Sequence, residues 1–191
     1  MRNVVSLFII IFCFLSISAC RNGQDKKADG IKDTITTMQK NSLKLGLERM
    51  EYCIPDNDTP RTDKMDAEYK LVVYVDSTLC SPCIINKMFW WNDIIDLTRK
   101  DKDNVDYIFI FEPKRNQIED AHLAAESSGL KNRLYLDTAC VFRAENSFIP
   151  SDDKYHTMLI NSKDSIVMVG SPLTNRSIRK VFLQILNIEN S

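Results

Sequence analysis

Apolar and polar residues follow one another in blocks after residue 65, and the blocks predict strands and helices in turn. Continuous apolar runs predict buried strands over Lys70–Asp76 and Val105–Phe111. Apolar residues at helical spacing predict helices over Cys83–Arg99 and Asn116–Ser128, and Gly129 suits the end of the second helix. This alternation requires parallel strands joined by crossover helices.

The last third of the chain predicts shorter elements. A short strand is expected over Arg133–Leu136, and a short helix or turn over Cys140–Phe148. Met158–Ile160 and Ser165–Val169 alternate around a polar turn, as in a β-hairpin, and one apolar face predicts a closing helix over Thr174–Ile188. The predicted fold class is therefore α/β, with a mixed central sheet and helices on both faces.

A helical extension is predicted before this domain, which we place at residues 65–191. Apolar residues spaced mostly three, four or five apart predict an amphipathic helix over Ile31–Cys53, weakened at Gly46. The polar segment Pro55–Thr62 is a loop by composition, so residues 31–64 form a helix and a loop. The apolar stripe favours packing on the domain, although a stalk or a dimer contact would also use it.

The first 19 residues have the pattern of an export signal. Met1–Asn3 carries a positive charge, and Val4–Ile17 is almost wholly apolar. This run is shorter than the roughly 20 residues that span a bilayer, so it fits a secretory signal, with an uncleaved anchor as the alternative. Ile17–Cys20 resembles a bacterial lipobox, which implies cleavage before Cys20 and attachment of lipid to that residue.

A lipid on Cys20 would hold the protein to a membrane of the cell envelope, facing the periplasm or the cell exterior. Several acyl chains anchor a protein stably, whereas one chain binds only marginally. Residues 20–30 are polar and show no periodicity, which is typical of a flexible tether. The net charge is −1 and no basic stripe is present, so the sequence lacks the clustered positive charge that is typical of nucleic-acid-binding proteins.

The candidate chemistry lies between the first predicted strand and the helix after it. Cys80 and Cys83 flank Ser81 and Pro82 there. A thiol attacks only as its thiolate, and the start of a helix favours negative charge, so we expect Cys80 to be the partly exposed nucleophile and Cys83 the more shielded resolving thiol. Pro82 removes a backbone N–H and fixes φ, so it should influence the redox balance. An exported dithiol meets conditions in which disulfides form and exchange.

The cysteines have other possible roles. A zinc site needs a second pair of ligands, and the other cysteines and histidines stand singly: Cys53, Cys140, His122 and His156. We therefore predict no metal and no cofactor. The dithiol could also be a fixed structural disulfide, although its place at a helix start favours exchange. Cys53 and Cys140 could pair with each other or remain free, and His122 suits a packing role.

The segment "YVDSTLCSPCIINKMFWWNDII", with the order of elements after it, resembles the thioredoxin superfamily. The likeness is to membrane-tethered oxidoreductases of the TlpA/ResA type, particularly Bacteroidetes lipoproteins; "LYLDTACVFRAENSFIP" and "TMLINSKDSIVMVGSPL" match their later part. The resemblance runs from Lys70 to about Ile188. It implies a thioredoxin-like fold and exchange with protein thiols and disulfides.

The chain departs from that family near the expected site. The family's cis-proline position falls at Tyr155 or His156, and its buried acid falls at Tyr74. His156 could face the cysteines and stabilise a thiolate, or lie on the surface before a strand. Asp76 could relay protons or cap the turn, and capping is favoured. Of Trp90 and Trp91, one should be in the core while the other could line a docking surface near the nucleophile.

The sequence thus predicts an exported, lipid-anchored thiol–disulfide oxidoreductase acting on protein disulfides through Cys80 and Cys83, supported by Pro82, Asp76 and His156. The alternative is a non-catalytic thioredoxin-like module that binds a partner at the membrane, favoured by the missing cis-proline. Transfer of a soft metal such as Cu(I) by the thiolate pair is a third possibility.

Overall fold

The computed structural model describes residues 28–54, 67–101 and 104–188. The predicted signal at residues 1–19 and the lipidated Cys20 lie outside the described residues. The chain divides into one unit that ends at Met38 and a second that runs from Gln39 and contains the sheet. None of the described helices has the length and apolarity needed to cross a membrane.

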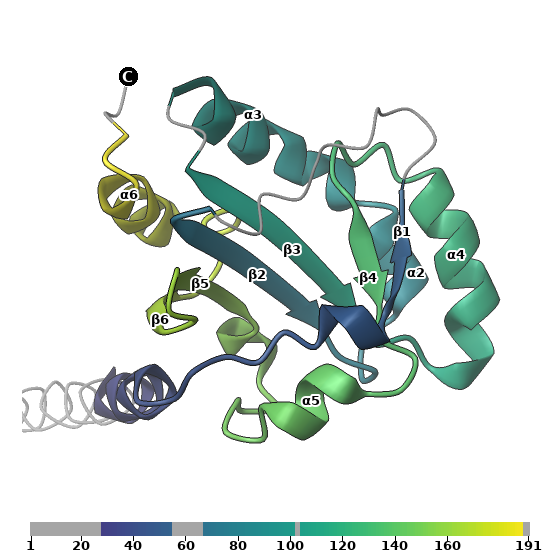
Figure 1. Ribbon diagram of the computed structural model, residues 1–191, viewed down its shortest axis with the longest axis horizontal. Coiled ribbons are helices and arrows are strands. Elements are labelled where there is room, and N and C mark those ends of the chain that lie inside the picture. The colour runs from purple at the N-terminus through teal and green to yellow at the C-terminus, as the bar shows by residue number, and fades with distance from the viewer. Residues whose placement is uncertain (1–27, 55–66, 102–103, 189–191) are drawn as a thin grey trace, which may run out of the picture. The chain divides into compact units, whose positions relative to one another are not determined.

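The central feature is a six-stranded mixed sheet with the order β1-β4-β3-β2-β5-β6 (Figure 1). β2, β3 and β4 are parallel, while β1, β5 and β6 run antiparallel to their neighbours. The mixed sheet predicted from the alternating start and the terminal hairpin is confirmed. The strands are β1 (Glu51–Cys53), β2 (Tyr69–Val75), β3 (Val105–Phe111), β4 (Leu134–Leu136), β5 (Thr157–Asn161) and β6 (Ile166–Val169).

The helix predicted over Ile31–Cys53 is wrong beyond residue 39, where the described helix ends. Gly46 adopts the left-handed conformation with φ 61°, which a helix interior does not accommodate. After the 3-10 helix η1 (Leu47–Arg49), the chain becomes β1 and pairs with β4. Strand pairing with a distant segment thus overrides the local helical spacing.

Most helices follow the predicted order, but the helix expected over Cys83–Arg99 is broken into three segments. Gly129, with φ 65°, follows α4 in the left-handed conformation expected of a helix stop. The helices after β1 are α2 (Ser81–Ile85), η2 (Met88–Trp91), α3 (Asn92–Asp101), η3 (Arg115–Gln117), α4 (Ile118–Glu126), α5 (Val141–Glu145), η4 (Asp153–Tyr155) and α6 (Arg176–Ile185).

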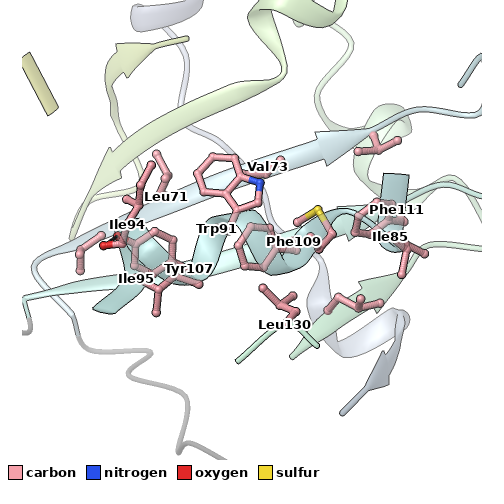
Figure 2. Packing of buried hydrophobic residues seen from close by; sticks show 14 of the residues in the cluster. Leu71, Val73, Ile85, Trp91, Ile94, Ile95, Tyr107, Phe109, Phe111 and Leu130 are labelled. Atoms are coloured by element: carbon pink, nitrogen blue, oxygen red, sulfur yellow. Dashed lines mark hydrogen bonds between the residues drawn. The ribbon is translucent and has the colours of Figure 1, made fainter. Parts of the chain in front are cut away.

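The two faces of the sheet carry different helices. Alternate residues of β2 and β3 form the main core with α2, α3, α4 and α6, and Trp91 packs edge to face on Phe109 at a centroid distance of 5.6 Å (Figure 2). Burying one aromatic side chain contributes about 4–6 kcal/mol, at roughly 25 cal/mol for each of about 150–250 Å². On the opposite face, Tyr74 packs against Phe142 of α5 at 4.7 Å. Helices on both faces are therefore confirmed, and Trp91 fixes the segment that follows the cysteines.

Candidate functional site

The two cysteines lie directly after β2, the strand between β3 and β5. Cys80 is the N-cap of α2 with extended backbone, and Pro82 lies in the first turn, where its missing N–H leaves no helical hydrogen bond unmade. Cys80 and Cys83 form a disulfide, with Cα atoms 5.3 Å apart. The fold therefore brings the two predicted thiols into bonding contact at the start of a helix.

Asp76 organises the turn that leads into Cys80. Its Oδ1 accepts a hydrogen bond from the backbone N–H of Thr78 at 2.9 Å and another from the Thr78 hydroxyl. The residue is buried, and the Leu79 N–H donates to its carbonyl at 3.2 Å. Of the two roles considered for Asp76, these contacts are those of a turn cap.

The expected exposure of the two cysteines is wrong in its order. Cys83 is exposed, whereas Cys80 is only half-buried. The reason is helical geometry: Ser81 and Ile85 are four residues apart, share one face of α2 and are fully buried. A residue two positions after Ser81 is turned roughly 200° away from that face, and so points outward.

His156 is buried beside β2 and is not the surface residue that one interpretation expected. It is 3% exposed, its Nε2 lies 2.8 Å from the carbonyl oxygen of Pro150, and its ring lies 5.1 Å from that of Tyr74. Its Nδ1 is buried with no hydrogen-bond partner among the described residues. These contacts do not include Cys80 or Cys83, and no described peptide bond is cis.

A buried carboxylate, which the sequence interpretation missed, occupies this face of the sheet. Glu112 has a side chain 1% exposed, and its two oxygens accept from the Tyr74 hydroxyl at 2.5 Å and from Arg143 Nη2 at 2.7 Å. Burial, followed by the hydrogen bond to Glu112, raises the pKa of Tyr74, so its phenol stays a donor. The available signal was Tyr74 itself: it pairs with Ile110, two residues before Glu112, and alternate strand residues share a face.

Cys53 and Cys140 are both free thiols. Cys53 Sγ lies 3.6 Å from His122 Nδ1, while His122 Nε2 lies 3.4 Å from Glu51. Burial raises the pKa of the Cys53 thiol to about 11, with smaller contributions from the Glu51 and Glu126 carboxylates. Cys53 is therefore protonated near neutral pH, and His122 links it to Glu51 rather than serving in packing alone.

Cys140 precedes α5 in an unusual conformation. Its φ is 56°, the left-handed region, and α5 is capped instead by Asp137, whose carboxylate accepts from the N–H groups of Val141 and Phe142, each at 2.8 Å. Burial and then the Glu112 carboxylate raise the pKa of the Cys140 thiol. The described residues contain no group of three or more His, Cys, Asp or Glu side chains placed to hold a metal ion.

The aromatic pair after the cysteines divides as the sequence suggested. Trp91 is 5% exposed and belongs to the core, whereas Trp90 is 54% exposed. Phe89, also exposed, lies beside Trp90 with ring centroids 5.7 Å apart. Two exposed aromatic side chains, Phe89 and Trp90, therefore follow Cys83 by six and seven residues in the sequence.

Comparison with known proteins gives likenesses of structure only. No family model and no curated protein sequence matches the chain. A candidate protein disulfide isomerase from Bacteroides thetaiotaomicron is 21% identical, with a TM-score of 0.43, over 63% of this chain and 72% of that one. A thioredoxin-like protein solved in its oxidised form is 12% identical, with a TM-score of 0.43, over 64% of this chain and 81% of that one.

A bacterioferritin comigratory protein from Xanthomonas campestris, described with alkyl peroxide reduction activity, is 10% identical, with a TM-score of 0.47, over 77% of this chain and 98% of that one. The fold of this chain is thioredoxin-like, with a mixed sheet and a dithiol directly after its strand β2.

Proposed function

We propose that the protein is an exported, lipid-anchored thiol–disulfide oxidoreductase of the TlpA/ResA type that acts on protein disulfides. The observation that carries the proposal is the Cys80–Cys83 disulfide at the start of α2, with one cysteine exposed and the other half-buried. A disulfide at such a position is accessible to an attacking thiolate, which exchange requires.

In the reducing direction, the Cys80 thiolate attacks one sulfur of a substrate disulfide and displaces the other as a thiolate. A mixed disulfide between Cys80 and the substrate results. The Cys83 thiolate then attacks the Cys80 sulfur, releases the second substrate thiolate and leaves the Cys80–Cys83 disulfide. Two electrons pass from the dithiol to the substrate, and the reverse sequence oxidises a substrate dithiol.

The decisive experiment is insulin-disulfide reduction by the lipid-free chain from Arg21 on. Wild type should be active, and Cys80→Ser and Cys83→Ser should each lose turnover. Cys53→Ser is the matched control and should keep full activity, since Cys53 is a free thiol. The proposal fails if wild type is as inactive as both variants and its dithiol does not equilibrate with glutathione.

The roles of the two cysteines are tested by trapping. Cys83→Ser should accumulate a mixed disulfide with a substrate protein, because the resolving thiol is missing. The greater exposure of Cys83 makes the reciprocal variant informative: if Cys80→Ser traps substrate and Cys83→Ser does not, the two roles are exchanged.

The anchor is proposed from the leader pattern alone. Its test is membrane partition of the full chain. Wild type should fractionate with membranes, and Cys20→Ala should be released. A Cys20→Ala protein that remains fully membrane-bound would remove the lipid from the proposal.

A non-catalytic binding module is the second candidate, because buried Tyr155 and His156 occupy the place where relatives carry a cis-proline, and no described peptide bond is cis. This candidate predicts stable capture of a partner by Cys80→Ser/Cys83→Ser. The oxidoreductase proposal instead predicts that capture depends on one remaining cysteine.

A further inference from the structure

A hollow of about 680 Å³ opens beside the turn that leads to Cys80. Ser77, Glu112 and Thr138 lie shortly after the ends of β2, β3 and β4, which are parallel, so the hollow lies at the carboxyl edge of the sheet. Ser77 is three residues before Cys80 along the chain. A substrate held in this hollow would therefore lie at the same edge of the sheet as the dithiol.

The hollow is lined by one carboxylate whose charge is already paired and by two cations whose charges are not paired within the described residues. Its carboxylate, Glu112, is already neutralised by Arg143 and hydrogen-bonded by Tyr74. Its two cations, Lys114 and Arg115, are exposed and form no ion pair with any carboxylate of the described residues.

The two acids that follow in the chain lie outside the hollow. Glu119 and Asp120 lie in the first turn of α4 but do not line the hollow. Since the whole chain has a net charge of −1, the two cations are not part of a generally basic surface. The Ser77 and Thr138 hydroxyls add hydrogen-bond donors to the lining.

We propose that this hollow binds acidic side chains of the substrate protein, next to the disulfide that exchanges with Cys80. This inference rests on the proposed function and names its substrate class: disulfides flanked by Asp or Glu. Lys114 and Arg115 act as specificity residues that contact the substrate carboxylates. Glu112 also lines the hollow, but its charge is already paired with Arg143, which does not line it.

The experiment uses two disulfide peptides that differ only in carrying Glu or Gln on either side of one cysteine. The lipid-free chain from Arg21 on should reduce the Glu peptide with a kcat/KM about five- to tenfold higher, since two exposed ion pairs contribute modestly. Lys114→Glu/Arg115→Glu should abolish or reverse this preference, and the preference should shrink as salt screens the charges. The control variant Lys163→Glu/Lys180→Glu makes the same charge change at exposed sites outside the hollow and should retain it.

Equal reduction of both peptides by wild type overturns the inference while leaving the oxidoreductase proposal intact, as does a preference that survives Lys114→Glu/Arg115→Glu. Reduction of neither peptide by wild type counts against the oxidoreductase proposal. The binding claim is then decided with Cys80→Ser/Cys83→Ser and labelled peptides. Tighter binding of the Glu peptide, lost with the charge reversal, supports the hollow; equal binding of both peptides overturns it.

Discussion

Replacing Tyr74 with Phe isolates one hydrogen bond in the protein interior. Tyr74 is 5% exposed, and its hydroxyl donates to Glu112 Oε2 at 2.5 Å. Phe keeps the ring that packs on Phe142, so the substitution removes the donor without creating a cavity. A hydrogen bond to a charged group contributes about 1.5–3 kcal/mol, so Tyr74→Phe should lower the free energy of unfolding by about 2 kcal/mol.

The assay is urea denaturation at neutral pH, supported by thermal melting. A loss of about 2 kcal/mol corresponds to a Tm decrease of about 4–8 °C for a chain of this size. Tyr52→Phe is the matched control: Tyr52 is 59% exposed, and its substitution should change stability by less than about 0.5 kcal/mol. If Tyr74→Phe is as stable as this control, the hydrogen bond from Tyr74 to Glu112 does not contribute the expected amount of about 2 kcal/mol to the free energy of unfolding.

A double variant tests this more strictly, because Tyr74 and Arg143 both donate hydrogen bonds to the Glu112 carboxylate. Arg143→Met alone should cost about 1–2 kcal/mol, since the Arg143 side chain is 55% exposed and its ion pair is partly screened. Tyr74→Phe/Arg143→Met leaves a buried charge without these partners and should exceed the sum of the single losses by about 1 kcal/mol or more. Adding Glu112→Leu to this double variant should recover part of the lost unfolding free energy, because the buried charge is then gone. The reasoning is refuted if the two single losses simply add and Glu112→Leu recovers nothing.

Two further predictions concern other sites. Because the pKa of Cys53 is raised from an ordinary 9.0 to about 11, its iodoacetamide alkylation at pH 8 should be about 100-fold slower than that of an ordinary thiol, and should rise tenfold per pH unit until about pH 11. Mass spectrometry measures this rate, and a plateau near pH 9 would contradict it. Asp137 is fully buried, so Asp137→Ala removes both acceptors at the start of α5 where water cannot replace them, and should cost about 2 kcal/mol in urea denaturation. Asn175→Ala, at the exposed cap of α6, should cost less, and equal losses would count against the burial argument.

Strands β2 to β6 were the most predictable part of the chain, whereas β1 was predicted as part of a helix. Val105–Phe111 was predicted to the residue, because a strand covered on both faces is a continuous apolar run. The sequence predicts one continuous helix over Cys83–Arg99 because Met88 and Trp91, three residues apart, fit either an α-helix or the 3-10 helix found there. Apolar spacing alone does not distinguish these two forms.

The site was predictable as a motif but not as an environment. Cys80, Cys83 and the capping role of Asp76 follow from local sequence. Glu112 accepts hydrogen bonds from Tyr74 and Arg143, which lie 38 positions before it and 31 positions after it in the chain, and only the strand register and α5 bring the three together. The exposure of Cys83 was missed because it depends on which face of α2 the core covers.

The edge strand β1 carries a consequence for the order of assembly. Glu51 pairs with Leu136, which lies 136 − 51 = 85 residues later in the chain. Closing so long a loop loses chain entropy before any hydrogen bond is gained, so this pairing should form late in folding. In a chain delivered amino end first, β1 emerges long before its partner strand exists. The open side of β4 stays uncovered until β1 docks, so unfinished copies can pair through this edge until that late step covers it.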